Sequence, residues 1–293
     1  MAAAALLAAL AAPGCGEDSS GSSGRSDRLV DFSKKPPYVN SLERDPDSGQ
    51  FLLTTNRGFF RIDPKTDRVR RVNGRVEAGG KGASVGTFLE LDVDPQGELV
   101  GSGHPDGRGP LPQYLGFLRS NDGGRKWSVI SRLGNADLHK IVFRHDRMYA
   151  WDAVLSAMVI SEDGGHSFSE HFTPRGLIID FEVDPDDPGR LLASTDEQLF
   201  LSEDEGESWR PALRAEGVRL AWPEPERLLV ATKDGRFQVS DDGGDTYDEV
   251  GRVDGEPVVI EAVSGDELYV ALSDGAILHS EDSGESFKEE FRP

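Results

Sequence analysis

The residues best suited to chemistry lie in and beside one long loop. The stretch GSGHPDGRGPLPQY from Gly101 carries imidazole, carboxylate, guanidinium and phenol side chains among several prolines, and the following segments add a second imidazole, two carboxylates and an indole. Such a cluster suits sugar or peptide binding, and histidine with aspartate is also enough for acid–base chemistry or a metal. The candidates are His104, Asp106, Arg108, Tyr114, Asp137, His139, Trp151 and Asp152.

A repeated motif predicts the elements that position these residues. The pattern S-x-D-x-G-x-x-aromatic starts at Ser120, Ser161, Ser202, Ser240 and Ser280, at intervals of 41, 41, 38 and 40 residues. This spacing is expected when each repeat is one four-stranded blade of a β-propeller. The sequence therefore predicts an all-β, six-bladed propeller, because a seventh blade has no room.

Each copy of the motif has the chemistry of a tight turn. Its aspartate can accept hydrogen bonds from turn amides, its glycine can adopt a positive φ, and its aromatic ring can be buried between neighbouring blades. Because each carboxylate is used by its own turn and no DxDxDG loop is present, we expect no metal. The aspartates are Asp122, Asp163, Asp204, Asp242 and Asp282, the glycines are Gly124, Gly165, Gly206, Gly244 and Gly284, and the aromatic residues are Trp127, Phe168, Trp209, Tyr247 and Phe287.

The remaining chain fits the same template. We place the propeller at residues 27–293, with blades near 27–75, 76–133, 134–174, 175–214, 215–252 and 253–293. The first blade lacks the motif, and IDPKTDRV from Ile62 makes the corresponding turn. RLVDF from Arg28 is the candidate strand that closes the ring with the last sheet, the alternative being that it is only a tether.

The long loop stands out against this template because most corresponding connections are short, such as SDG from Ser273. Long structured loops are often functional, and propeller sites form where loops converge around the channel. We therefore expect the candidate residues to face one another there. The alternative is structural: His104 caps the loop, Trp151 belongs to the core and His139 satisfies a strand end. No catalytic residue and no cofactor are assigned.

The N-terminus predicts export. Residues 1–15, MAAAALLAALAAPGC, suit a secretory signal, and Cys15, the single cysteine, follows a lipobox-like Ala-Pro-Gly. We expect a lipid on Cys15 and a flexible tether at 16–26, which places the protein on the outer face of a bacterial membrane or in the periplasm. Cleavage after Ala11, which would give a secreted soluble protein, is the alternative.

The charge balance argues against polyanionic partners. The chain has 32 basic and 53 acidic residues, and no basic cluster follows any one element. Nucleic acid is therefore not expected as a partner. We expect a monomer that binds a glycan or an envelope protein.

The repeated motif resembles the Asp-box, or BNR repeat, of sialidases, sortilin-like receptors and photosystem assembly factors. The order GSGHPD, LPQYLGFLRSNDGG, ADLHK and YAWD looks like an exported bacterial family of Asp-box propeller lipoproteins commonly labelled glycosylhydrolase or exo-alpha-sialidase-like. The resemblance implies a six- or seven-bladed fold, a surface location and Asp-boxes that are scaffold. Where such relatives carry a His-rich strand, this chain has YVNSLERDP from Tyr38.

Sialidase activity is not expected from these residues. A sialidase needs an arginine triad and a tyrosine nucleophile. FRID from Phe60 superficially resembles the FRIP arginine motif of sialidases, but Arg61 falls within a predicted strand and Asp63 replaces the proline of that motif. Three readings remain: a binding or assembly module that uses its top face, a glycoside hydrolase or lyase, and a purely structural envelope protein.

Overall fold

The structure, a computed structural model, describes residues 32, 36–45 and 48–293. The signal segment, Cys15, the tether and most of RLVDF lie outside these residues. The part of the chain that is described consists of strands, turns and loops, and none of it forms a helix long and apolar enough to span a lipid bilayer.

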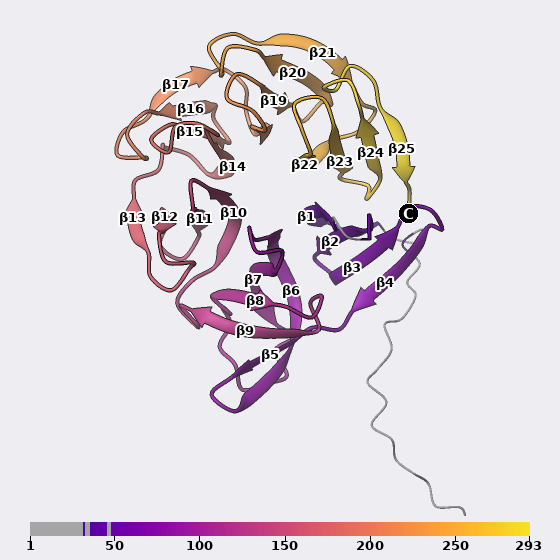
Figure 1. Cartoon of the computed structure of the whole chain (residues 1–293), viewed down its shortest axis with the longest axis vertical. Coiled ribbons are helices and arrows are strands. Elements are labelled where there is room, and N and C mark those ends of the chain that lie inside the picture. The colour runs from indigo at the N-terminus through magenta and orange to yellow at the C-terminus, as the bar shows by residue number, and fades with distance from the viewer. Residues whose placement is uncertain (1–31, 33–35, 46–47) are drawn as a thin grey trace, which may run out of the picture.

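In the described part of the chain, twenty-five strands form a ring of sheets (Figure 1). Five of the sheets have four antiparallel strands in chain order. The first contains β1 (Val39–Arg44), β2 (Phe51–Thr55), β3 (Gly58–Asp63) and β4 (Arg68–Val72); another contains β10 (Leu138–Arg144), β11 (Arg147–Asp152), β12 (Ala157–Ser161) and β13 (Ser169–His171). The next is built from β14 (Ile178–Val183), β15 (Leu191–Thr195), β16 (Leu199–Ser202) and β17 (Arg210–Leu213). The last two comprise β18 (Arg219–Ala221), β19 (Leu228–Ala231), β20 (Arg236–Ser240) and β21 (Asp248–Arg252), then β22 (Pro257–Ala262), β23 (Leu268–Leu272), β24 (Ile277–Ser280) and β25 (Lys288–Phe291).

The remaining described sheet has five strands, of which the first two form a hairpin. It contains β5 (Arg75–Ala78), β6 (Lys81–Val93), β7 (Leu99–Pro105), β8 (Phe117–Ser120) and β9 (Lys126–Ser131). The short β5 pairs antiparallel with β6 and parallel with β9, so it joins the two ends of this sheet. The β5–β6 hairpin extends outward from the ring (Figure 1).

The recurrent serine, aspartate and glycine residues form one hydrogen-bonded turn between the third and fourth strands of a sheet. In the copy at β12–β13, Ser161 Oγ donates to Asp163 Oδ1 at 2.8 Å and accepts from the Gly165 amide at 2.8 Å. The same Asp163 oxygen accepts the amides of His166 and Ser167. The Ser167 hydroxyl also donates to Asp163 Oδ2 at 2.6 Å, and this bond, together with the others, holds the pKa of Asp163 well below its usual range. The turns at the other four copies repeat the serine bonds.

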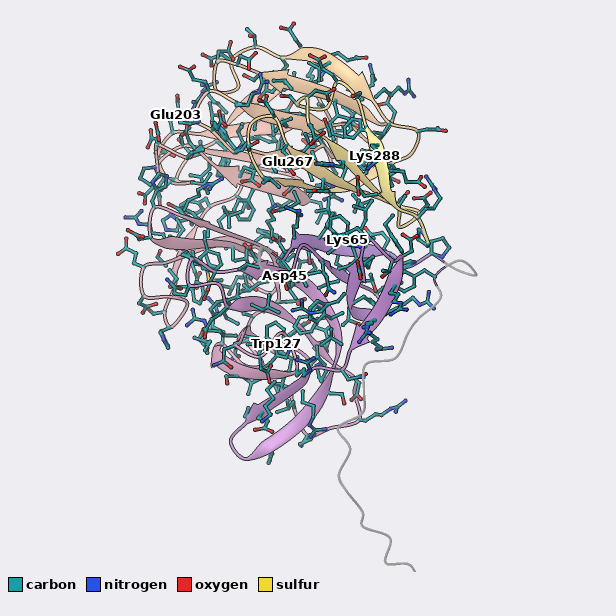
Figure 2. The ribbon with its side chains drawn as sticks, turned by 45° about the vertical axis from the view of Figure 1, so that its right-hand side comes forward. Asp45, Lys65, Trp127, Glu203, Glu267 and Lys288 are labelled. Carbon is teal, nitrogen blue, oxygen red and sulfur yellow. The ribbon has the colours of Figure 1, made fainter. Side chains whose placement is uncertain are left out.

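Each turn also attaches its sheet to a neighbour. Gly165 has φ +89°, and a Cβ there would lie 2.3 Å from a ring carbon of Phe117, which belongs to the preceding sheet. Of the five motif aromatics, Trp127 is fully buried, packs on Phe88 and donates Nε1–H to the Gly124 carbonyl at 2.8 Å (Figure 2). The other four are half-buried. The motif thus ties sheets together, because rings and glycines pack across sheet boundaries.

Within the described residues, the ring closes through side-chain contacts. The first and last sheets take all their described strands from residues 39–72 and 257–291, and Phe51 meets Tyr269 edge-on across the seam with ring centroids 5.2 Å apart. Of the proposed closing segment RLVDF, only Phe32 is described; it lies outside any strand and is buried against Phe60. The last sheet therefore has its four strands without a contribution from the described part of that segment.

Candidate functional site

The first strand of every four-stranded sheet, together with β6, surrounds the central channel (Figure 1). We call these channel-lining strands the inner strands. The turns between third and fourth strands follow the ends of β8, β12, β16, β20 and β24 at one face of the ring, whereas the inner strands begin at the opposite face. Three cavities share residues with one another in order along the channel, so they lie end to end from one face to the other.

The cavity where the inner strands begin, which we call the mouth, has a volume of about 370 Å³. Tyr38 is 56% exposed there and Trp151 is half-buried, so two aromatic faces border one hollow. Arg219 donates one guanidinium N–H to the Ile179 carbonyl at 2.8 Å, which fixes the side chain across the neighbouring strand β14. The mouth is lined by Tyr38, Val39, Asn40, His139, Lys140, Trp151, Ile178, Ile179, Arg219 and Val258.

Asp137 bridges two histidines beside the mouth. Its Oδ1 lies 3.1 Å from His104 Nε2, and its Oδ2 lies 3.4 Å from His139 Nε2. Although partial burial opposes ionisation, the bond and charge of His139 together with those of His104 hold the pKa of Asp137 below its usual value. An ionised aspartate therefore orients both imidazoles, as a positioning carboxylate does in acid–base sites.

Asp152 binds the backbone next to this cluster. It is fully buried, and its Oδ1 accepts the backbone amides of Asp137 at 3.2 Å and Val154 at 3.0 Å, while Arg132 lies 3.2 Å from its Oδ2. Its carboxylate therefore shapes the start of β10 and does not face the mouth.

The long loop divides between the two predicted roles. The Tyr114 ring contacts His104 edge-on, with centroids 5.6 Å apart. Asp106 and Arg108 do not join the cluster: both are exposed, and Asp106 Oδ1 accepts the Arg108 backbone amide at 3.0 Å, which closes a local turn. The structure thus brings together His104, Tyr114, Asp137 and His139, places Trp151 at the mouth next to His139, buries Asp152 beneath them and leaves Asp106 and Arg108 apart.

The channel below the mouth is lined by charged groups on the inner strands. Lys140 Nζ lies 3.3 Å from Asp180 Oδ1 and 3.4 Å from Glu182 Oε1. Asp180 also accepts the backbone amides of Phe181 and Leu220, and so connects β14 to β18. Arg144 donates to the Trp222 carbonyl at 3.0 Å near the far end of the channel.

Most of the channel carboxylates are held away from their ordinary ionisation range. Burial, together with neighbouring carboxylates, raises the pKa of Glu43 well above the usual value, and burial does the same for Glu90. Burial raises the pKa of Asp92 to about 7, and burial with the nearby Asp92 raises the pKa of Glu261 to about 8. Burial alone would lower the pKa of Lys140, but Asp180 and Glu182 raise it above its ordinary value.

No protein-family model and no curated protein matches the sequence. Among solved structures, the chain is similar to XC5397, a gluconolactonase from Xanthomonas campestris, with a TM-score of 0.61 and 12% identity over 87% of this chain and 89% of that one. It is also similar to the WD40 β-propeller domain of Doa1, with a TM-score of 0.61 and 11% identity over 90% and 84% of the two chains. The chain is a β-propeller. A third similar structure, YCF48 bound to D1 peptide, has a TM-score of 0.53 and 17% identity over 84% of this propeller and 93% of that chain.

Sequence reasoning did not single out the channel residues of this propeller. A signal was present: acidic residues interrupt the apolar first strands, as in SLER from Ser41, LELDV from Leu89, IIDFEV from Ile178 and VIEA from Val259. An ionisable residue inside an apolar strand suggests a polar cavity on one face of that strand. Within the ranges described, no group of three or more His, Cys, Asp or Glu residues is placed to hold a metal ion.

Proposed function

We propose that this propeller is a binding module that holds an extended protein segment at the mouth. The observation that carries the proposal is the pairing of two accessible aromatic side chains, Tyr38 and Trp151, with the polar groups of His139 and Arg219 around one cavity of about 370 Å³. Binding pockets typically combine such apolar faces with a few fixed polar groups.

The chemistry of the mouth suits a polypeptide. The aromatic rings offer large contact area, while imidazole and guanidinium N–H groups can donate to backbone carbonyls of a bound segment. A similar propeller, YCF48, is described with a bound D1 peptide, which supports peptide binding as a use of this fold. That likeness concerns the fold alone.

A glycan is the second candidate ligand, because Tyr38 and Trp151 also offer faces on which a sugar ring can stack. The enzymatic alternative, a glycoside hydrolase or lyase, rests on the His104–Asp137–His139 contacts, in which two imidazoles share one ionised carboxylate. It would require one of these histidines to exchange a proton with substrate.

We further propose that the five four-stranded sheets and the β5–β9 sheet are six blades, and that the recurrent turns are Asp-box hairpins. The repeated Ser-to-Asp and Gly-to-Ser hydrogen bonds support this.

We also propose export and a lipid on Cys15. Mass spectrometry of the protein expressed in a bacterium should find an N-terminal acylated cysteine, and Cys15→Ser should abolish it; an unmodified or absent Cys15 in the mature protein would contradict the anchor.

The decisive experiment for the mouth compares variants of the full chain on a peptide array and a glycan array. We expect a peptide ligand whose affinity falls by about tenfold to a hundredfold in Trp151→Ala, because aromatic anchors dominate such interfaces. His139→Ala should weaken the same ligand. Phe172→Ala and His166→Ala are matched controls, since Phe172 is 68% exposed on the outer rim and His166 lies in an outer turn.

The outcomes separate the readings. A peptide hit that Trp151→Ala weakens supports the module, and a glycan hit lost in the same variant supports the second candidate. Turnover of a glycan that is lost in His104→Ala and His139→Ala would establish the enzyme instead. Hits that persist in every mouth variant would place binding elsewhere and contradict the proposal.

A further inference from the structure

The half of the channel farther from the mouth, which we call the lower channel, is a strongly acidic cavity. It has a volume of about 220 Å³. Five carboxylates face it together with two cationic side chains, Lys140 and Arg144. The carboxylates belong to Glu43, Glu90, Asp92, Glu182 and Glu261.

Only some of these carboxylates have a partner within the described part of the chain. Glu182 pairs with Lys140, and Asp92 Oδ1 accepts the Val93 amide at 2.6 Å. The carboxylates of Glu43, Glu90 and Glu261 have neither a hydrogen bond nor an ion pair with any described residue. Unpaired acids from three different inner strands, β1, β6 and β22, thus face the same space.

Among the three, Glu90 gives the strongest indication of a ligand. The residue is only 7% exposed, yet it lines both the lower channel and the adjoining cavity of about 60 Å³, so its carboxylate is directed into the channel. A buried polar group without a partner costs free energy and is rare in folded proteins. The charged groups around it are Lys140 on β10, Asp92 on β6, Asp180 on β14, Glu261 on β22 and Glu43 on β1.

We propose that the lower channel binds an alkylammonium group, a primary amine on an aliphatic chain, with Glu90 as its main acceptor and Glu43 and Glu261 beside it. An ammonium carries three N–H donors on one atom, which matches carboxylates that approach from three strands. The fold already holds such a group in this channel, since the Lys140 ammonium lies between Asp180 and Glu182. The end-to-end cavities accommodate a linear aliphatic chain.

The site should take up its ligand with release of protons. Burial raises the pKa of Glu90 well above its usual value, and burial with the nearby Asp92 raises the pKa of Glu261 to about 8. An ammonium group favours the ionised form of both carboxylates, so its binding displaces their protons. The affinity for the amine therefore increases as the pH rises toward the pKa of Glu261. It weakens again only near the pKa of the amine itself, about 10.4.

The test is calorimetric titration of the full chain with 1,5-diaminopentane in phosphate buffer at about pH 6 and about pH 8.5. We expect affinity on the order of tenfold higher at the upper pH, and a loss of about tenfold or more in Glu90→Gln, because a charge-assisted contact is removed. The control Glu203→Gln makes the same charge change at an exposed residue on the periphery (Figure 2) and should leave affinity unchanged.

Two further arms complete the design. Nα-acetyl-lysine methylamide tests the lysine side chain as the source of the amine: binding of both probes supports a side chain of a partner, and binding of the diamine alone supports a free amine. Trp151→Ala should not change either titration, so failure at the mouth and failure in the lower channel are distinguishable.

Absence of binding by both probes at both pH values would overturn the proposal, as would equal diamine affinity in Glu90→Gln and the unaltered protein. Removal of a buried carboxylate should not lower the melting temperature. If Glu90→Gln nevertheless fails to fold, Glu261→Gln serves as the second variant with the same expected loss.

Discussion

Glu261 shows how one residue links the channel to the stability of the fold. It lies on β22 among apolar neighbours, faces the lower channel and has no described hydrogen bond or ion pair. Burial raises its pKa to about 8, so near neutral pH the folded protein retains a proton that an unfolded chain, with a pKa of about 4.3, has released.

We predict that Glu261→Gln reduces the dependence of stability on pH. Since the folded state binds more protons between about pH 4.3 and pH 8, the free energy of unfolding due to this residue falls as pH rises through that window. Urea denaturation at about pH 5 and about pH 9 measures how far the free energy of unfolding falls between the two pH values. We expect this fall to be smaller in Glu261→Gln than in the unaltered protein by roughly 1–2 kcal/mol, a figure reduced because solvent in the channel screens the charge. Glu256→Gln, an exposed neighbour in sequence, should behave like the unaltered protein; an identical pH dependence in Glu261→Gln would contradict the burial argument.

The glycines of the recurrent turn allow a second test at the scale of one residue. Gly164 and Gly165 both have positive φ, at +72° and +89°, but they differ in surroundings. A Cβ at Gly165 would strike the Phe117 ring at 2.3 Å, whereas at Gly164 the nearest atom is the tip of Arg119 at 3.9 Å.

We predict that Gly165→Ala lowers the free energy of unfolding by about 3 kcal/mol and Gly164→Ala by only about 1 kcal/mol. The difference measures the packing of the turn on the preceding sheet, since the backbone strain is common to both. Chemical denaturation of the two variants checks it, and equal losses would mean that the turn does not fix the two sheets together.

At the scale of elements, β10 connects the mouth with the channel. It presents His139 at the mouth, Lys140 to the channel and Arg144 at the far end, while alternate residues such as Ile141 pack in the core. Lys140 bridges to β14, so an ion pair joins two sheets that share no strand pairing.

We predict that Lys140→Met destabilises the protein by about 2–3 kcal/mol at neutral pH. The loss is less than for a fully buried pair because the Lys140 side chain is 24% exposed to the channel. Acidification to about pH 5 should restore part of it, since burial raises the pKa of Glu182 and its protonation removes an uncompensated charge. Lys65→Met, at an exposed turn (Figure 2), is the control and should be near neutral in thermal melts; a similar effect of both variants would contradict the role of the channel pair.

The elements also show what the sequence could reveal. The period near 40 residues predicts the all-β propeller, and the turn chemistry predicts which side chains hold each turn. The β5–β6 hairpin was not predicted: Gly79 and Gly80 form its two-residue turn, but the hairpin lies outside the period of the repeat. Likewise the meeting of Glu43, Glu90 and Glu261 depends on closure of the ring, which brings together strands far apart in the chain.

How far the sequence could predict the position of a candidate residue depended on how local its contacts are. His104 and Asp137 lie 33 positions apart and meet only because β7 and β10 belong to adjacent sheets. Loop insertion pointed to that neighbourhood. It did not distinguish Asp152, which is buried at the end of β11, or Arg108, which is exposed in the loop, since the burial of each depends on the path of its own backbone segment.

At the scale of the whole molecule, the seam between the first and last sheets is a packing interface. Phe51 is 1% exposed and meets Tyr269, while Arg44 lies over the same tyrosine ring at 5.5 Å from its centroid. Among the described residues, these side-chain contacts, and no shared strand, join the first and last sheets.

We predict that Phe51→Ala lowers the free energy of unfolding by about 3–4 kcal/mol, whereas Phe172→Ala changes it by less than about 0.5 kcal/mol. Hydrogen exchange should show that the loss of protection in Phe51→Ala begins at β1, β22 and β23. Protection lost uniformly around the ring would contradict a localised seam.

Because each four-stranded sheet pairs strands that are consecutive in the chain, its described strands form all their pairings without a described partner from the distant terminus. Each sheet can therefore assemble in the order in which the ribosome releases it and dock on the one before, as in other arrays stabilised by nearest neighbours. Only the last docking step, at the seam, requires the whole polypeptide. Nascent chains that end near residue 252 should accordingly resist proteolysis over their earlier sheets, yet lack the channel wall that Glu261 completes.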